Sequence, residues 1–533
     1  MRGADLVVKS LTEAGVKTIF TLSGNQIMPI FDACFDAGIR LIHTRHESAA
    51  VFMADAYAQV TGEVGIALVT AAPGFANGLG GVYSALMAES PVVFLSGDSP
   101  RSMDGKGAFQ ELDQVAMSAP VTKLSLRPKR AEELGNDMAT AIRTATSGRP
   151  GPVHVALPFD LLNAEVGNTL VPVADAFARE AISAGTETIK SIADAVARAE
   201  RPVILTGPLL NRSRGGDVVA ALETALDAPV FAMESPRGIK DPSLGGVAKV
   251  LAKADVVLSL GKNMDFTTGF AKPPTIGDDC RFYMIDPDSD VIDRAHKALG
   301  GRMAMAVKAD APDAARALTA LGKSSNARAP WRAEIAAGLA ERQETHGKPG
   351  EAMHPAVMSA GIQQFLDSQD NSIAVIDGGE VGQWAQAGIT APTRLINGPS
   401  GAIGGCLCYA IAAKIAEPDR TVVVIMGDGT AGFHFAEFET AARYGAGIIA
   451  VIGQDCRWNA EYQIQLRDYG SDRLYECELS EARYDLAAAG LGCQGERATT
   501  AQELSAALNR AADSGKPACI VAMIEGHAAP SGH

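Results

Sequence analysis

A short acidic turn in the last quarter of the chain has the composition of a phosphate and metal site. It reads Gly427-Asp428-Gly429, and a second acidic residue, Asp455, follows further along the chain. Glycine lets the backbone come close to a phosphate, and a carboxylate can hold a hard cation that bridges phosphate oxygens. The expected ligand is therefore a diphosphate with Mg²⁺. An unrelated turn in which both aspartates only cap helices is the alternative at this point.

Two predicted strands and a helix would bring these residues together. The β-branched runs 421–425 and 448–452 predict neighbouring parallel strands that end just before the two aspartates. A helical pattern begins near Phe433, with apolar residues on one face. Ligands of parallel sheets bind at the carboxyl ends of the strands, where the free N–H groups of a following helix can face a phosphate.

The Gly-Asp-Gly turn and the strand after it resemble the metal signature of the thiamine diphosphate (ThDP) enzymes, in which the second strand ends in Asn. The resemblance implies that Asp428 binds the metal and that Gly427, Gly429 and Thr430 lie against the diphosphate. These residues are the first part of the expected cofactor site.

One position departs from the family pattern. The register places Asp455 where the family has its metal-binding Asn, and Arg457 where a backbone carbonyl completes the coordination. Aspartate keeps an oxygen ligand but adds a negative charge beside the diphosphate. Either Arg457 offsets that charge or the cofactor binds less tightly.

The first part of the chain has the pattern of a sheet that could carry the other half of such a site. Residues 1–165 alternate helical and strand patterns, with strands expected at 17–22, 40–43, 65–70 and 91–96. This alternation predicts a doubly wound parallel sheet, with the turns after the strands at one edge.

One of these turns contains a candidate catalytic residue. The segment from Arg45 to Ala50 and the run Met53–Ala58 resemble the part of the pyruvate oxidase and acetolactate synthase branch that carries its catalytic glutamate. The resemblance implies that Glu47 hydrogen-bonds the aminopyrimidine ring and activates the cofactor. Taken alone, Glu47 would be an ordinary carboxylate at a helix N-terminus, favoured there by the helix dipole.

Two more segments of the first domain resemble the same branch. A turn from Pro73 to Asn77 resembles a Pro-Gly-x-x-Asn turn that faces the cofactor, and Ala108–Asp113 resembles a pattern whose glutamine, here Gln110, lies by the active site. Gln110 in a surface loop is the alternative. Lys123 is either a site residue or a solvated charge.

Two glycine-rich turns of the last domain complete the expected cofactor site. Gly378, Gly379 and Glu380 follow the predicted strand 373–376 and form a second phosphate-facing turn. The segment 398–405 contains Gly401 and Ile403 and opens a small-residue helix. In the family a bulky apolar residue at the Ile403 position wedges between the two cofactor rings, and a plain core isoleucine is the alternative.

The middle of the chain predicts a third α/β unit. Expected domains are 1–165 (pyrimidine-binding), 190–325 (central) and 350–533 (diphosphate-binding), each a doubly wound parallel sheet. The family's central domain binds FAD in acetolactate synthase, ADP-like groups in CoA enzymes and nothing in many decarboxylases. Gly207-Pro208 replaces the glycine-rich turn expected beside FAD phosphates, so FAD is possible but not expected.

Composition excludes several classes of protein. With 533 residues and a net charge of −15, the chain lacks the basic surface of a nucleic-acid-binding protein, and no apolar run is long enough to span a bilayer. The N-terminus leads directly into an amphipathic helix instead of a signal peptide. Eight scattered cysteines are typical of reduced thiols, and a cytoplasmic protein is expected.

The resemblance covers most of the chain and implies a ThDP- and Mg²⁺-dependent enzyme. The expected reaction makes or breaks a C–C bond next to a carbonyl, as in an acetolactate synthase-like 2-oxo acid decarboxylase or carboligase. The cofactor would lie between the first domain of one subunit and the third of another, in a homodimer or homotetramer.

Two other functions stay open. A 2-hydroxyacyl-CoA lyase or oxalyl-CoA decarboxylase would take an acyl-CoA substrate, with Arg212, Arg214, Arg237 and Lys240 as candidates for binding the CoA phosphates. The substitution at Asp455 also keeps open a non-catalytic binding protein with the same fold.

Overall fold

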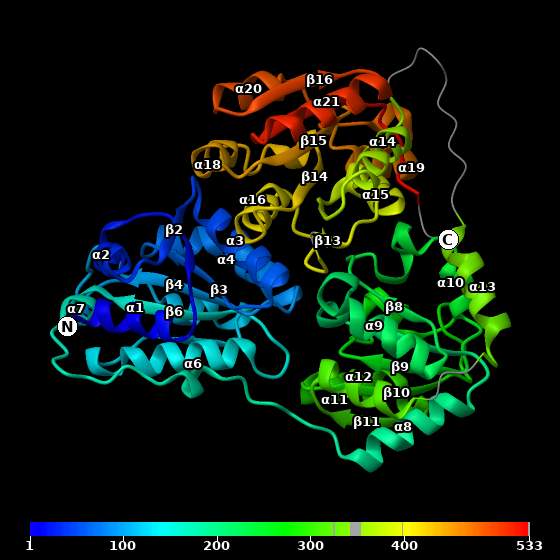
Figure 1. Ribbon diagram of the computed structural model, residues 1–533, viewed down its shortest axis with the longest axis horizontal. Coiled ribbons are helices and arrows are strands. Elements are labelled where there is room, and N and C mark those ends of the chain that lie inside the picture. The colour runs from blue at the N-terminus through cyan, green and yellow to red at the C-terminus, as the bar shows by residue number, and fades with distance from the viewer. Residues whose placement is uncertain (323–325, 342–352, 397, 531–533) are drawn as a thin grey trace.

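Three parallel sheets, one after another along the chain, form the framework of the protein. The structure, a computed structural model, describes residues 1–322, 326–341, 353–396 and 398–530. Figure 1 shows the first sheet and its helices in blue and cyan, the central ones in green and the last in yellow to red. This confirms the predicted fold class of three α/β units. The predicted boundaries at 325, 350 and 533 lie outside the described residues.

The first sheet has the strand order β2-β1-β3-β4-β6-β5. Its central strands are buried along their whole length, because helices cover both faces. The elements are β1 (Thr18–Thr21), β2 (Arg40–His43), β3 (Gly65–Val69), β4 (Val92–Asp98), β5 (Leu124–Leu126), β6 (Val153–Pro158), α1 (Gly3–Glu13), α2 (Met28–Ala37), α3 (Glu47–Thr61), α4 (Pro73–Met87), α5 (Gln114–Ser118), α6 (Leu134–Thr146) and α7 (Phe159–Asn163).

The central sheet has five strands in the order β11-β10-β9-β7-β8. Sequence patterns predict strands at 202–206, 229–233, 255–260 and 282–286, and the structure has a strand at each of these places. A fifth strand, β11, joins them at one edge. The elements are β7 (Pro202–Thr206), β8 (Val230–Ala232), β9 (Val256–Leu260), β10 (Arg281–Asp286), β11 (Met303–Lys308), α8 (Thr186–Arg198), α9 (Arg212–Leu226), α10 (Val247–Leu251), α11 (Ser289–Leu299), α12 (Ala311–Leu321) and α13 (Ala329–Ala340).

The last sheet has the order β13-β12-β14-β15-β17-β16, which repeats the order of the first sheet strand for strand. The elements are β12 (Ser372–Ile376), β13 (Thr393–Ile396), β14 (Thr421–Gly427), β15 (Ile448–Gln454), β16 (Gln494–Ala498), β17 (Ala518–Met523), α14 (Pro355–Asp367), α15 (Gly379–Gly388), α16 (Cys406–Ala416), α17 (Asp428–Ala431), α18 (Glu437–Tyr444), α19 (Asn459–Tyr469), α20 (Tyr484–Gly490) and α21 (Ala501–Ser514). The two outer sheets are therefore built on one plan.

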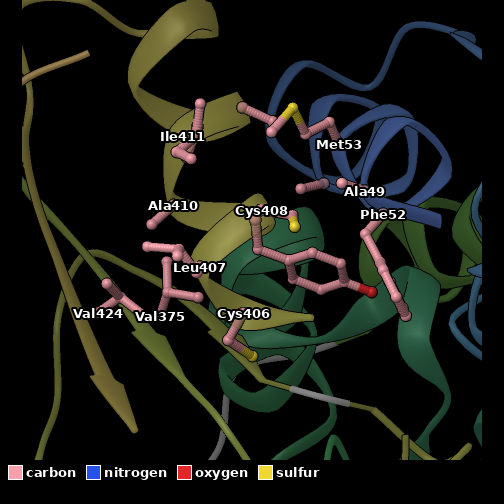
Figure 2. Close-up of a cluster of buried hydrophobic side chains, with 14 of the residues drawn as sticks. Ala49, Phe52, Met53, Val375, Cys406, Leu407, Cys408, Ala410, Ile411 and Val424 are labelled. Atoms are coloured by element: carbon pink, nitrogen blue, oxygen red, sulfur yellow. The ribbon is translucent and has the colours of Figure 1, made fainter. Parts of the chain in front are cut away.

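Helices α3 and α16 join the first and last sheets into one apolar core. Figure 2 shows Phe52 and Met53 of α3 on the side of α16 that carries Cys408. Small residues allow the two helices to approach closely: a Cβ at Gly405 would lie 2.9 Å from the Phe52 ring. One polar pair crosses this core, where the hydroxyl of Tyr409 donates to the buried carboxylate of Asp55.

Buried arginines attach the central sheet to its neighbours. Arg149 of the first domain pairs with both Glu89 and Asp286, the last residue of β10. On the other side, the guanidinium of Arg394 in β13 donates to Glu234 over 2.8 and 3.2 Å. Such pairs need both partners, because an unpaired charge in the interior costs several kcal/mol. The three units are thus held in a fixed arrangement.

Two element boundaries differ from the predictions. The helix expected near Phe433 begins at Glu437, because the segment before it turns to let His434 donate to the carbonyl oxygen of Gly404. Helix α4 begins at Pro73, so Asn77 lies in a helix and not in a turn. Proline fits the first helical position because its fixed φ suits a helix and its missing N–H is not needed there.

Among the described residues, the structure contains no helix that is both long and apolar enough to cross a membrane.

We predict that Arg149→Ala lowers the free energy of unfolding by about 3–5 kcal/mol, because Glu89 and Asp286 would lose the guanidinium that neutralises them. Chemical denaturation measures the change. The control is Arg130→Ala, whose exposed pair with Glu133 is worth less than about 1 kcal/mol. Equal effects of the two substitutions would contradict a structural role for the Arg149 pairs.

Candidate active site

Glu47 lies at the carboxyl edge of the first sheet, as the first residue of α3. Its Oε2 accepts a hydrogen bond from Asn77 Nδ2 at 3.0 Å, and a Cβ on Gly74 would come within 3.5 Å of its Oε1. Pro73 and Asn77 are exposed, and Glu47 is half-buried. The structure therefore brings Asn77 and the start of α4 to one accessible carboxylate.

Gln110 reaches the same sheet edge through two other side chains. Gln26 donates to Gln110 Oε1 at 2.6 Å and accepts from the hydroxyl of Thr70 at 2.7 Å. Gln110 has a φ of +61°, in the left-handed region that non-glycine residues rarely adopt. Sequence reasoning noted the turn containing Gln26 but assigned that residue no role.

A cavity of about 230 Å³ lies at the carboxyl edge of the last sheet. Its walls include every residue of this domain that the sequence predicted for the site: Gly378, Gly379, Glu380, Gly401, Ile403, Gly427, Asp428, Gly429, Thr430, Asp455 and Arg457. Gly379 and Gly401 have φ values of +75° and +68° with open space where a Cβ would be, so their backbone faces the cavity directly. This is the geometry of a cradle for an anionic ligand.

One buried carboxylate fixes two of the glycine-rich turns relative to each other. Asp377 accepts hydrogen bonds from the backbone N–H of Gly378 at 2.7 Å and of Gly404 at 3.0 Å. Its burial raises the pKa of Asp377 to about 6. The sequence placed Asp377 in the predicted turn but gave no sign of this bridging role, which depends on a contact between distant segments.

Asp428 and Asp455 share the floor of the cavity. Backbone N–H groups of Gly429 and Cys456 donate to Asp428 at 3.1 and 3.0 Å. Burial, and then the charge of Asp455, raise the pKa of Asp428 to about 7. Burial likewise raises the pKa of Asp455 to about 6, although the backbone N–H and the charge of Arg457 act in the opposite direction. Two carboxylates in this position need a cation to stay ionised together.

The donor set fits Mg²⁺. Asp455 Oδ2 is buried and has no hydrogen-bond partner among the described residues, whereas its Oδ1 accepts from Arg457 N at 3.1 Å. Hard cations prefer carboxylate, carbonyl and phosphate oxygens. No cluster of three or more His, Cys, Asp or Glu side chains suited to a metal occurs in the described part of the chain. A metal here would therefore need further oxygens from a diphosphate or from water.

Arg457 is near the pair but its guanidinium is engaged elsewhere. It lies 4.4 Å from the centroid of the Tyr462 ring. A Cβ on Gly526 would meet Arg457 Nη1 at 2.7 Å, so the side chain is confined between these residues. Arg457 contributes a backbone N–H to Asp455 and a nearby positive charge, and its place beside a metal stays a prediction.

Within one chain the two half-sites are separate. The cavity is lined only by residues 235–237 and 378–461, and neither Glu47 nor Gln110 reaches it. The Glu47 turn instead rests on the last domain, where Glu437 accepts from the backbone N–H of Arg45 and His46 at 2.9 and 3.1 Å. This contact explains why the turn that presents Glu47 is held firmly.

His434 makes a second contact to the same turn. It donates from Nδ1 to the Gly404 carbonyl, and its Nε2 lies 2.8 Å from the hydroxyl of Ser48. Burial lowers the pKa of His434, so the ring is neutral and Nε2 accepts the Ser48 proton. Neither His434 nor Ser48 was predicted, because no local pattern connects residues so far apart in sequence.

The basic residues considered for CoA or the active site have different environments. Arg214 is inside the protein and donates to the carbonyl oxygens of Ala88 and Glu89 at 2.7 and 2.8 Å. Lys123 donates to the carbonyl oxygens of Thr144 and Ser147 near the end of α6, away from the predicted site. Both side chains therefore bind backbone carbonyl oxygens, and Arg214 also lines the larger cavity described below. Arg237 is different, because it lines the cavity of the last domain.

Two basic side chains make polar contacts at the carboxyl edge of the central sheet. Arg149 donates to the carbonyl oxygen of Gly261 at 3.3 Å and pairs with Asp286. Beside it, the buried Lys262 donates to the hydroxyl of Thr267 at 2.5 Å. Nucleotides bind open parallel sheets at this edge. That FAD is not expected here stays a prediction.

A larger cavity, of about 640 Å³, lies between the first and central domains. It is bounded by residues 14–18 and 60–64, which precede β1 and β3. That is the amino edge of the first sheet. The smaller cavity is the candidate cofactor site, because the predicted residues of the last domain and the carboxyl ends of its strands coincide there.

Comparison with known families agrees with this geometry. The description "Thiamine pyrophosphate enzyme, N-terminal TPP binding domain" matches residues 1–117, the central domain of the same family matches 189–318, and its C-terminal TPP binding domain matches 377–522. The chain belongs to the thiamine pyrophosphate enzyme family. The predicted ThDP enzyme family is thereby confirmed, and the half-sites around Glu47 and Asp428 fall inside its two TPP-binding domains.

Relatives within the family have more than one named activity. A probable acetolactate synthase of Mycobacterium bovis is 30% identical over 98% of this chain and 95% of its own length. A 2-hydroxyacyl-CoA lyase 2 of Bos taurus is 30% identical over 92% of this chain and 84% of its own. The ThDP-dependent 4-hydroxybenzoylformate decarboxylase of Rhodococcus jostii shares the fold, with a TM-score of 0.83 at 24% identity, covering 99% of this chain and 100% of that chain.

We predict that Asp428→Ala abolishes Mg²⁺-dependent ThDP binding, because a metal ligand and its bridge to the diphosphate are lost together. Isothermal titration with and without Mg²⁺ measures this. The control is Asp419→Ala, which removes an exposed carboxylate just before Thr421, the first residue of β14. This variant should bind ThDP normally. Unchanged affinity and Mg²⁺ dependence in Asp428→Ala would exclude Asp428 as a ligand.

We predict that Asp455→Asn tightens ThDP about tenfold at saturating Mg²⁺, because it keeps the oxygen ligand and removes one negative charge beside the phosphates. Asp468→Asn removes the same charge from the surface and should change nothing. A weaker complex of Asp455→Asn would show that the aspartate is the preferred ligand and that its charge is already balanced.

Proposed function

We propose that the chain is a ThDP- and Mg²⁺-dependent enzyme that makes or breaks a C–C bond next to a carbonyl, as an acetolactate synthase-like 2-oxo acid decarboxylase or carboligase. The observation that carries the proposal is the cavity that gathers Asp428, Asp455 and three glycine-rich turns at neighbouring strand ends. The metal ligands that it offers are oxygen atoms, which suit Mg²⁺ together with a diphosphate. The family match to both TPP-binding domains supports the same conclusion.

The residues of the last domain would hold the cofactor. Asp428, Asp455 and the backbone of Arg457 supply oxygens to Mg²⁺, and the turns at Gly378 and Gly401 present backbone to the diphosphate. Ile403 lines the same cavity and supports the cofactor rings. When bound, ThDP supplies an acidic C2–H group and an electron sink for the bond that breaks.

The first domain would supply the proton chemistry. Asn77 orients the Glu47 carboxylate, whose other oxygen would exchange a proton with the pyrimidine ring of the bound cofactor. Gln110, positioned by Gln26, faces the same edge and would orient the substrate. Pro73 begins the helix that brings Asn77 into place.

The separation of the half-sites supports an assembly of at least two chains. Glu47 of one chain would complete the cavity of its partner, as in a homodimer with two equivalent sites or a tetramer of two such dimers.

We also propose the domain limits 1–165, 190–325 and 350–533. A cytoplasmic location is supported by the eight free cysteine thiols, seven of them buried.

The substrate is the main distinction between the candidate functions. The 2-hydroxyacyl-CoA lyase relatives favour a second candidate, an acyl-CoA substrate. A screen of the ThDP-loaded protein against 2-oxo acids and acyl-CoAs, monitored by CO₂ release and mass spectrometry, separates the two. CO₂ from a 2-oxo acid supports the first candidate, and acyl-CoA cleavage supports the second. No turnover with tight ThDP binding would instead support a non-catalytic protein.

We predict that Glu47→Gln keeps ThDP affinity but slows H/D exchange at C2 of the bound cofactor by roughly 10²–10⁴-fold, because an amide cannot share the ring proton. Exchange at the wild-type rate would remove Glu47 from the mechanism.

Mixing Glu47→Gln and Asp428→Ala subunits tests the assembly as well. A mixed dimer contains one site with both native residues and should regain activity that neither variant has alone.

A further inference from the structure

The cavity of the last domain has one wall from the central domain. Ser235, Pro236 and Arg237 line it opposite the turns at Gly378 and Gly427. The segment 234–241 therefore needs an account of its own.

This segment is held rigidly against the last domain. Glu234 at its start is buried and bound by Arg394 of β13, and Asp241 at its end is buried and accepts from Ser243 N at 2.8 Å. Gly238 has a φ of +55°, and a Cβ there would lie 2.0 Å from the carbonyl oxygen of Thr267. The backbone N–H of Arg237 donates to the hydroxyl of Ser235 at 3.1 Å. The loop thus presents Arg237 from a fixed backbone.

The Arg237 guanidinium is free to bind a ligand. Its side chain is exposed to solvent at the cavity, and with the described residues it makes no hydrogen bond or ion pair. By contrast, the guanidinium of Arg457, the other cation of the cavity, stacks on Tyr462. An arginine presents a planar fork of N–H donors that matches phosphate oxygens.

The charge of the cavity calls for such a cation. Four carboxylates line it, those of Glu380, Asp428, Asp455 and Glu461, against only two arginines. Asp428 and Asp455 can share a metal, but Glu380 lies at the start of α15, where the free N–H groups would face a phosphate. Burial raises the pKa of Glu380, and the backbone N–H of Ala529 and then the charge of Arg237 oppose that rise. Arg237 and Glu380 line the same cavity, so the arginine shares that cavity with the phosphate-facing turn.

We propose that Arg237 is a ligand of the cofactor's diphosphate, supplied by the central domain. The inference rests on the proposed function, since it takes ThDP as the ligand of this cavity. It gives the central domain a direct role in cofactor binding. The same fork could bind the phosphates of CoA, so the test must separate the two sources of phosphate.

Titration calorimetry at saturating Mg²⁺ and without substrate compares wild type, Arg237→Ala and Arg237→Gln. We expect both variants to bind ThDP about tenfold more weakly. The matched control is Lys240→Ala, which removes one charge from the same loop at an exposed side chain outside the cavity and should keep wild-type affinity. Inorganic diphosphate with Mg²⁺ should show the same loss, because the proposed contact is to phosphate alone.

Two further outcomes would overturn the proposal. If Arg237→Ala binds ThDP as wild type does but loses affinity for CoA, the arginine belongs to a CoA site. If Glu380→Gln restores full affinity to Arg237→Ala, Arg237 only offsets Glu380 and does not touch the diphosphate. We expect the loss to persist in the double variant. Failure of wild type to bind ThDP at all would instead refute the proposed function, which keeps the two tests distinct.

Discussion

The packing of α3 against α16 is the contact on which the arrangement of the outer domains depends. It merges the apolar clusters of two sheets into one core and seals the Asp55–Tyr409 hydrogen bond inside it. Because protein interiors are close-packed, shifts at such a contact are transmitted rather than absorbed. The Glu47 turn begins α3, and the Ile403 turn leads into α16. Both candidate half-sites therefore depend on this helix pair for their position.

Negative charge is the second constraint. Buried carboxylates stand at the ends of several strands, including Asp377, Asp428 and Asp455 in the last domain. Some of these carboxylates accept hydrogen bonds from backbone N–H groups and hold loops in place. Others lack enough partners, and a buried charge without a partner is costly. The difference between Asp377, with several backbone donors, and Asp455, with an unpartnered oxygen, separates a structural carboxylate from one available to a metal.

Sequence patterns predicted the residues of each half-site but not how the half-sites relate. Glycine turns after β-branched runs are local signals, and they located Asp428, Gly379 and Gly401 at one cavity. The supports of Glu47 by His434 and Glu437 join segments almost 400 residues apart, for which one sequence contains no local sign. Sequence patterns likewise do not reveal that Arg237 lies at this cavity. Its loop follows a predicted strand of the central sheet, yet only the domain arrangement brings it to the cavity of the last domain.

The repeated strand order of the outer sheets has an evolutionary consequence. In each sheet the second strand in sequence lies at the edge, and the helix after it, α3 or α16, leads to the third strand. These equivalent helices pack on each other, so the chain contains an internal near-symmetric pairing of the kind that identical subunits form. Duplication of one ancestral sheet that paired with its own copy is consistent with this repeated order. In that case the two copies diverged, so that one now carries the Glu47 turn and the other the glycine-rich cavity.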